Sequence, residues 1–267
     1  MSLTVLSVAY PFARLGDDAV GGAEQVLGQL DAALVAAGHR SIVVAAAGSR
    51  TAGTLLPTVV PDAPVDDALR QHAWAQQRAQ IARALASWPV DVIHMHGVDF
   101  PACLPPPGAA PVLATLHLPP AWYPPRVFDG LRPDVHLLCV SRSQRRACPA
   151  GARVLGVIEN GVPVPALQSR CRKRPFALAL GRVCPEKNLH VALEAGRRAQ
   201  LPVVIGGRVF PYEAHERYFR EQVLPRLDGQ RRFLGPLAFA RKRRLLTAAR
   251  CLLLPTRRFS SSESSTL

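Results

Sequence analysis

The chain has 267 residues, of which 48% are hydrophobic and 19% are charged, so it can bury the core of one large domain or of two modest ones. Lys and Arg outnumber Asp and Glu by 33 to 19, which gives a formal net charge of +14. No apolar run approaches the length of a membrane span, so the composition excludes an integral membrane protein built from helices.

The positive charge is concentrated in the second part of the chain. Residues 1–165 contain 12 Arg and 12 acidic residues, whereas residues 166–267 contain 18 Arg and 3 Lys against 7 acidic residues. Such asymmetry predicts a partner with negative charge, which could be a phosphorylated small molecule, an anionic membrane surface or nucleic acid. Charge alone does not choose among the three.

The N-terminus and the cysteines indicate the compartment. The first residues lack the basic start and long apolar core of a signal peptide and are better interpreted as a strand. The six cysteines form no C-x-x-C pair and have no nearby His at metal-ligand spacing, so we interpret them as reduced, mostly structural thiols. We therefore expect a cytoplasmic protein without a bound metal or cofactor, whose membrane contact, if any, is peripheral at the inner face.

Short apolar runs alternate with helix-like stretches along the first part of the chain. Continuous apolar strands separated by helices predict a parallel sheet that is covered on both faces. The predicted strands are 4–9, 41–46, 91–94, 112–117, 135–140 and 154–158. Helices are predicted over 22–37 and 66–87.

The pattern restarts after a Pro-rich linker and a basic stretch at 170–174. Strands are predicted over 176–180, 202–205, 232–234 and 251–254, with helices over 189–200, 213–227 and 238–249. The sequence therefore predicts two α/β domains, 1–165 and 166–256, followed by a divergent polar tail at 257–267. We expect two doubly wound domains that face a cleft, the second of them incomplete.

A cationic loop follows the first predicted strand of the second domain. It runs from Gly181-Arg182 to Lys187 and precedes a predicted helix. Ligands of open α/β sheets bind at the carboxyl ends of strands, and a guanidinium and an ammonium near a helix start suit a diphosphate. A solvated basic turn is the alternative for this motif in isolation.

A glycine pair, Gly21-Gly22, ends the long loop after the first predicted strand and opens a helix. Glycines there let backbone N–H groups approach a phosphate without a side chain in the way. The segment is not G-x-G-x-x-G, so a dinucleotide site has no support, and a plain turn is the alternative.

Several short motifs occur in a fixed order over roughly residues 3–256. Together they resemble the retaining family 4 glycosyltransferases of the GT-B fold, which have two Rossmann-like domains. The motifs are Gly21-Gly22-Ala23-Glu24, Ala37-Gly38-His39, residues 91–96, Thr115-Leu116-His117, Val140-Ser141-Arg142-Ser143, Glu159-Asn160-Gly161-Val162 and residues 181–187. The resemblance implies transfer of a sugar from a nucleotide-sugar donor to an unknown sugar, lipid-linked or small-molecule acceptor, with no required metal.

The resemblance also implies roles for individual residues. Arg182 and Lys187 would hold the donor diphosphate and stabilise the leaving nucleotide by electrostatic catalysis. Gly21 and Gly22 would let the N-terminal loop close over the phosphates and the sugar, with the first domain on the acceptor side. His117 matches the family histidine near the reacting sugar, where hydrogen bonding is favoured over general-base work; a packed strand-end histidine is its alternative. His94 and His96 are expected to point in alternate directions along their strand, with one facing the core.

The chain departs from the family pattern after Thr256. The family continues into a pair of glutamates that contact the donor, but here Glu263 is three residues out of register and has no partner downstream. A frameshift, a cloning boundary or a natural short form would each give such a tail. We therefore expect weak or lost turnover from an apparently truncated transferase.

Two other functions remain open on the residues alone. The chain could be a non-catalytic nucleotide-binding or transferase-associated fragment. The basic second part could instead bind nucleic acid, including the run Arg241-Lys242-Arg243-Arg244, but no recognised nucleic-acid motif is present and no specific nucleic-acid partner is predicted.

Overall fold

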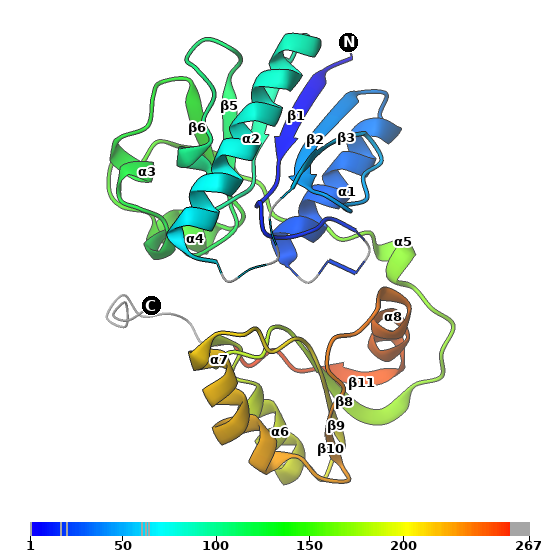
Figure 1. The fold of residues 1–267 in the computed structure, drawn as a ribbon. Helices are drawn as coiled ribbons and strands as arrows, with labels where there is room; N and C mark the ends of the chain where they lie inside the picture. Colours follow the sequence, from blue (N-terminus) through cyan, green and yellow to red (C-terminus); the bar gives the residue numbers. More distant parts are fainter. Residues whose placement is uncertain are drawn as a thin grey trace. The chain divides into compact units, whose positions relative to one another are not determined.

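The computed structural model describes residues 2–16, 18–19, 21–59, 61, 63 and 65–256. The chain divides into two compact units, Met1–Val162 and Pro163–Leu267, named unit 1 and unit 2 below. Each unit has its own parallel sheet and its own helices (Figure 1).

Unit 1 is built on a seven-stranded parallel sheet with the order β3-β2-β1-β4-β5-β6-β7. Its strands are β1 (Thr4–Val8), β2 (Arg40–Ala46), β3 (Thr54–Thr58), β4 (Val92–Met95), β5 (Val112–Leu116), β6 (Val135–Cys139) and β7 (Val154–Val157). Its helices are α1 (Gly22–Ala36), α2 (Asp67–Ser87), α3 (Arg126–Asp129) and α4 (Arg142–Ala147). The strand order reverses direction at β1 and β4, which is the topological switch point where ligands bind in open α/β sheets.

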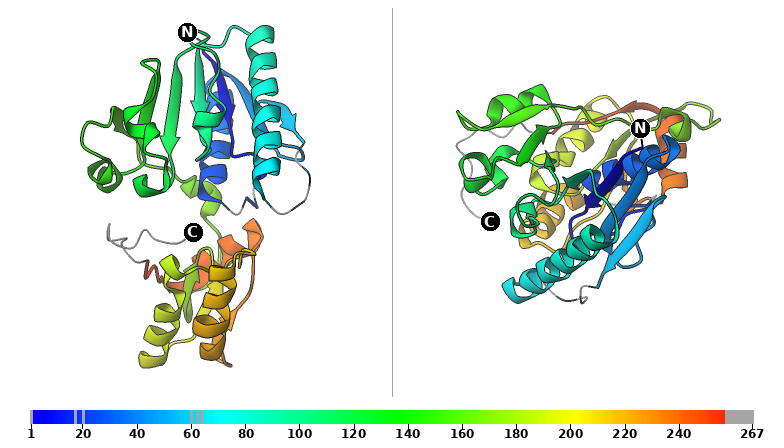
Figure 2. Two further views of the ribbon diagram at one scale, coloured as in Figure 1. Left: turned by 60° about the vertical axis from the view of Figure 1, so that its left-hand side comes forward. Right: turned by 90° about the horizontal axis from the view of Figure 1, so that it is seen from above.

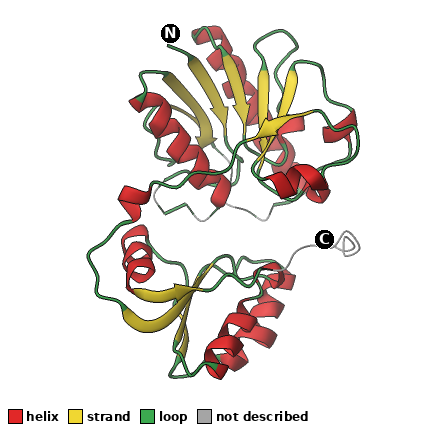
Figure 3. Ribbon diagram, turned by 180° about the vertical axis from the view of Figure 1, so that it is seen from behind, coloured by secondary structure: helices red, strands yellow, loops and turns green. Residues whose placement is uncertain are grey.

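The two long helices of unit 1 cover opposite faces of the sheet. Ile42 and Val44 of β2 share a core with Ile81 of α2, whereas the intervening Val43 shares a second core with Leu27 of α1. This alternation follows from the two-residue period of a strand. α2 therefore lies in front of the sheet in Figure 1, and α1 lies in front of it when the unit is seen from behind in Figure 3.

Unit 2 is built on a four-stranded parallel sheet with the order β10-β9-β8-β11, so its switch point lies between β8 and β11. Its strands are β8 (Arg174–Leu180), β9 (Val203–Gly206), β10 (Arg231–Phe233) and β11 (Ala249–Leu252). Its helices are α5 (Val164–Leu167), α6 (Leu189–Arg198), α7 (Glu213–Tyr218) and α8 (Phe239–Ala248).

Alternate residues of the central strand β8 also point into two cores in unit 2. Ala177 and Ala179 pack with Leu193 of α6, whereas Leu178 packs with residues of α8. α6 and α7 therefore lie on the face of the sheet opposite to α8 (Figure 2).

The prediction of an α/β protein with two parallel sheets is confirmed, and the predicted strands and long helices all form. β3 was missed, because it is short and contains Pro57, which favours a loop assignment. β3 is an edge strand of the sheet, where a missing N–H is tolerated. The helix predicted over 213–227 continues past α7 as a π-helical segment, Phe219–Val223, and a 3₁₀ turn, Leu224–Arg226.

Candidate functional site

Three histidines meet at the carboxyl end of β4 and β5 in unit 1. His96 Nδ1 lies 3.0 Å from His117 Nε2, and the two rings stack with centroids 5.2 Å apart. His94 Nε2 lies 2.8 Å from Thr115 Oγ1, and its ring centroid is 4.1 Å from that of His96. The predicted site residue His117 is therefore part of a connected group of imidazoles.

Burial keeps these imidazoles neutral. Desolvation lowers the pKa of His117 to about 4, and desolvation together with the nearby His117 lowers the pKa of His94 to about 4. The pKa of the fully buried His96 lies well below its usual value for the same reason, with His94 and His117 adding to the shift. At neutral pH this strand edge carries hydrogen-bonding groups without charge.

The expectation that His94 and His96 point in alternate directions was wrong. Residues two apart along an extended chain lie on the same side, which is why the two rings touch. Burial distinguishes the two side chains, since His96 is 3% exposed whereas His94 is half-buried.

Two polar side chains fix the backbone that carries His117. The backbone N–H groups of His117 and Leu118 donate to Tyr123 Oη at 3.0 and 3.3 Å. The Gln144 amide donates to the carbonyls of Leu116 and Leu118, both at 2.7 Å, and accepts from the N–H of Val140 at 2.7 Å. His117 therefore stands on a braced segment.

The glycine pair lies where helix α1 begins. Gly21 is the N-cap residue, and a Cβ at this position would overlap the carboxylate of Glu24, whereas a Cβ at Gly22 would meet nothing within 4 Å. Glu24 is buried in the first turn, so a carboxylate already lies at this helix N-terminus. An added Cβ at position 21 would therefore require the end of the Glu24 side chain to move.

The cationic loop of unit 2 leaves the carboxyl end of β8 at the switch point. Arg182 and Lys187 are half-buried, and neither forms an ion pair within the described part of the chain. The aliphatic stem of Lys187 passes Gly181, whose position would place a Cβ 3.5 Å from Lys187 Cδ. The loop therefore presents two cations without a protein counter-ion, as an anion site requires.

A third arginine, missed by the sequence analysis, lies on the neighbouring loop after β9. The carbonyl of Arg208 accepts a 2.9 Å hydrogen bond from the N–H of Val183, and its guanidinium lies 5.4 Å from the centroid of Phe210. A Cβ at Gly207 would overlap the carbonyl oxygen of Gly181, so only glycine lets the two loops approach this closely. The pair Gly206-Gly207 at the end of β9 is the sequence feature that could have indicated a ligand-binding loop there.

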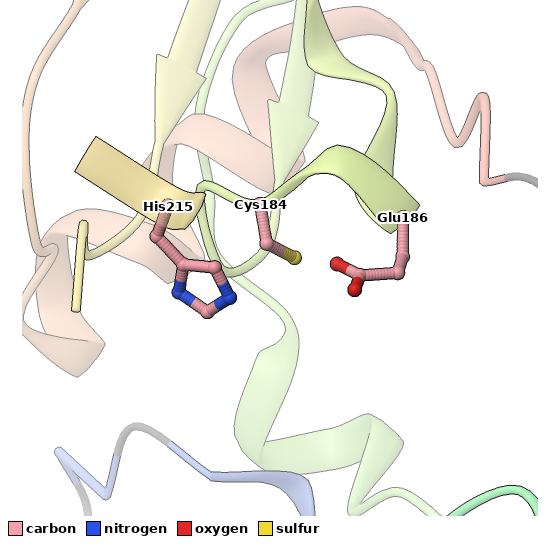
Figure 4. A group of neighbouring side chains, drawn as sticks. All are labelled: Cys184, Glu186 and His215. Carbon is pink, nitrogen blue, oxygen red and sulfur yellow. The ribbon is translucent and has the colours of Figure 1, made fainter. Parts of the chain in front are cut away.

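A cysteine, a glutamate and a histidine also meet beside this loop (Figure 4). One ligand atom from each of Cys184, Glu186 and His215 lies within 4.8 Å of the other two. Burial raises the pKa of the Cys184 thiol to about 11, and the carboxylate of Glu186 adds to the shift. This group was not predicted from the sequence, because Cys184 and His215 are far apart along the chain.

An arginine-lined hollow lies in unit 1. Its volume is about 590 Å³, and its lining residues are Arg142, Arg145 and Arg146 of α4 together with Val157 of β7. The sequence analysis singled out Arg142 only as part of a motif. Glu263 and the rest of the polar tail lie outside the described residues.

Comparison with known families decides the affiliation of the chain. A family model described as "Glycosyltransferase Family 4" matches residues 20–165, which is more than half of the chain. The chain belongs to this family of glycosyltransferases. No curated protein matches it significantly.

Solved structures of glycosyltransferases confirm the GT-B fold for this family member. AviGT4, a glycosyltransferase involved in avilamycin A biosynthesis, has 20% identity and a TM-score of 0.65, with 95% of this chain and 69% of that chain covered. The catalytic domain of starch synthase IV from Arabidopsis thaliana, bound to ADP and acarbose, has 14% identity, a TM-score of 0.62 and coverage of 96% and 78%. HepE of Anabaena, in complex with UDP and glucose, has 17% identity, a TM-score of 0.62 and coverage of 95% and 74%.

Among the described residues, no helix combines the length and the apolar character needed to cross a bilayer.

Proposed function

We propose that this chain transfers a sugar from a nucleotide-diphosphate sugar to a hydroxyl-bearing acceptor, with retention of configuration at the anomeric carbon. The observation that carries the proposal is the loop after β8, where Arg182 and Lys187 are half-buried without a counter-ion in a member of a glycosyltransferase family. The nucleotides in the structures of starch synthase IV and HepE support a nucleotide donor.

The loop's cations would act on the leaving group. As the bond between the anomeric carbon and the diphosphate oxygen breaks, its electron pair stays on the diphosphate, where negative charge grows. The guanidinium of Arg182 and the ammonium of Lys187 would stabilise this charge without a metal ion. The acceptor oxygen forms the new bond to the anomeric carbon on the face that the diphosphate leaves, and its proton passes to the departing diphosphate oxygen, which has gained the electron pair.

His117 would donate a hydrogen bond rather than act as a general base. Its pKa of about 4 makes it a weak proton acceptor at neutral pH. His96 Nε2 is buried without a hydrogen-bond partner among the described residues. Since an unpaired nitrogen lone pair is tolerated better than an unpaired N–H, we place the proton of the neutral His96 ring on Nδ1. His96 then donates from Nδ1 to His117 Nε2, which leaves the proton of His117 on Nδ1 to donate to a sugar or acceptor hydroxyl.

Gly21 and Gly22 are proposed to serve the loop that precedes α1. The resemblance gives this loop the task of covering the phosphates and the sugar. Gly21 is the N-cap residue of α1, and an added Cβ there would lie where the Glu24 carboxylate now is. Substitution by alanine would displace the Glu24 carboxylate first.

Calorimetric titration with uridine, guanosine and adenosine diphosphate sugars tests the donor site. We expect one base to be bound, and Arg182→Ala and Lys187→Ala each to weaken its binding by about tenfold or more. Arg241→Ala on the exposed face of α8 is the matched control and should leave the affinity unchanged. A folded chain that binds no member of the panel, or binds it equally after both substitutions, contradicts the proposal.

Turnover requires a separate measurement. Release of nucleotide diphosphate reports the rate, and nuclear magnetic resonance of the product reports the anomeric configuration. An inverted product would refute retention. Donor affinity with no turnover would instead favour the non-catalytic nucleotide-binding alternative.

Peripheral contact with an anionic membrane is a further part of the proposal, together with a cytoplasmic location. Its support is the arginine-lined hollow on unit 1, which adjoins a strand whose Leu155 is 66% exposed, followed by Ile158 at 63%. Cationic and apolar side chains together suit anionic lipid headgroups. Co-sedimentation with anionic vesicles, but not with neutral ones, is expected; equal sedimentation with both would count against it.

A further inference from the structure

We propose that Cys184, Glu186 and His215 form a zinc site that fixes the loop after β8. This inference is independent of sugar transfer, since it concerns a metal bound by unit 2 itself. The thiol of Cys184 lies between the carboxylate of Glu186 and the imidazole of His215 (Figure 4). One ligand atom from each side chain lies within 4.8 Å of the other two.

Two buried atoms in this group have an unmet bonding capacity. Glu186 Oε2 and His215 Nδ1 are both inaccessible to solvent, and neither has a hydrogen-bond partner among the described residues. A buried polar atom without a partner is costly and calls for a physical explanation. A metal ion between the three side chains would satisfy Glu186 Oε2, and its third ligand would be the ring nitrogen of His215 that faces the thiol (Figure 4).

The backbone holds the ligands in place. Cys184 and Glu186 belong to one tight turn, in which the carbonyl of Cys184 accepts a 3.1 Å hydrogen bond from the N–H of Lys187. His215 stands in the first turn of α7, where its ring packs edge-on against Tyr212 with centroids 5.1 Å apart. Cys184 is itself fully buried, so its thiol is held inside unit 2.

The ligand set favours zinc. A thiolate and an imidazole are ligands for borderline-soft ions, whereas Mg²⁺ and Ca²⁺ prefer oxygen atoms alone. Zn²⁺ takes four ligands at about 2.0–2.3 Å, so three side chains would leave one position for water. Binding would release the thiol proton to solvent and form the zinc–sulfur bond, with no change of oxidation state.

Charge around the group is compatible with this ion. A thiolate and a carboxylate together balance the two charges of Zn²⁺. The guanidinium of Arg182 is a cation that acts on both Cys184 and His215. Its repulsion weakens the site but does not cancel two anionic ligands.

Titration of the full chain with Zn²⁺ tests the proposal. The protein is prepared without a histidine tag, stripped with a chelator and titrated in competition with a chromogenic chelator. We expect one Zn²⁺ per chain and a rise in Tm on zinc addition. Co²⁺ should give a near-ultraviolet charge-transfer band from a thiolate ligand.

Variants assign the binding to these three side chains. Cys184→Ser should abolish stoichiometric binding and the cobalt band, and the exposed Cys251→Ser is the matched control that should retain both. Since Cys184 is part of the core, His215→Gln provides a second variant at a half-buried position. Absence of one-to-one binding by the wild type, or binding that survives His215→Gln, would overturn the proposal.

Discussion

The carboxyl edges of the two sheets share a strand order but carry different chemistry. Unit 1 has β3-β2-β1-β4 around its switch point, and unit 2 has the equivalent β10-β9-β8-β11. The edge of unit 1 carries imidazoles whose pKa values are lowered by burial, whereas that of unit 2 carries a half-buried guanidinium and ammonium. The topology provides the position, and the burial of the side chains decides whether the edge is charged.

The comparison can be measured because the two units carry different probes. All three tryptophans, Trp74, Trp88 and Trp122, belong to unit 1. Tryptophan fluorescence therefore follows unit 1 alone, whereas circular dichroism follows both units. Each prediction below is expected to change one signal more than the other.

The largest effect of a single substitution is expected from Gly207→Ala in unit 2. The added Cβ would overlap the backbone carbonyl of Gly181, which cannot rotate away, so we expect a loss of about 3 kcal/mol in the free energy of unfolding. Urea unfolding followed by circular dichroism should shift while the tryptophan transition stays in place. Gly229→Ala, where a Cβ meets nothing within 4 Å, is the control.

A smaller loss is expected from the same substitution at Gly97, which lies at the carboxyl edge of the sheet in unit 1. Its Cβ would meet the end of the Asp99 side chain, at 2.5 Å from Oδ1, and a side chain can shift where a backbone carbonyl cannot. Gly97→Ala should therefore cost less than Gly207→Ala. Equal losses for the two substitutions would show that close approach of the strand-end loops in unit 2 is not the reason for Gly207.

The second effect is the acid sensitivity of unit 1. The folded pKa values of His94 and His117 are about 4, below the ordinary histidine value of 6.5, so the unfolded chain binds more protons between these limits. The contribution of the two neutral imidazoles to the free energy of unfolding is therefore present at neutral pH and is lost as the pH falls from about 6.5 to 4. The loss should reach at most about 3 kcal/mol per imidazole.

His117→Asn separates this contribution from general acid unfolding. Removing one titrating ring should reduce the pH dependence of the tryptophan-monitored free energy of unfolding over the same window. A variant with the slope of the wild type would show that His117 is not held neutral by its surroundings.

The smallest effect is expected at Asn188 in unit 2. This residue precedes α6 with φ of 54°, a left-handed conformation that asparagine tolerates and glycine adopts without strain. Asn188→Gly should change the free energy of unfolding by less than about 1 kcal/mol, and Asn188→Ala should lower it by about 1 kcal/mol. Urea unfolding of both variants, followed by circular dichroism, measures these changes. An Asn188→Ala variant more stable than the wild type would be inconsistent with this backbone conformation.

The sequence predicted the parallel sheets well because their strands are continuous apolar runs between helices. β3 was not predicted, because one proline within five residues is a strong loop signal. The proline is acceptable in this strand only because β3 lies at the edge of the sheet. Local periodicity carries no information on which edge a strand will occupy.

The candidate site was predictable only where its residues lie close in sequence. Arg182 and Lys187 share one loop and were found by their spacing. His215 joins Cys184 only after β9 has brought α7 beside the loop, and the hydrogen bond between His96 and His117 depends on the pairing of β4 with β5. Long-range pairing of this kind has no signature in either segment alone.

The position of β1 at the centre of its sheet has a consequence for synthesis on the ribosome. All five of its residues are buried, and one edge pairs with β4, so that Val8 is matched to Met95. At roughly 5–20 residues per second, the partner emerges several seconds or more after β1 itself. The apolar strand β1 must therefore stay unaggregated while its partner β4 is still being translated.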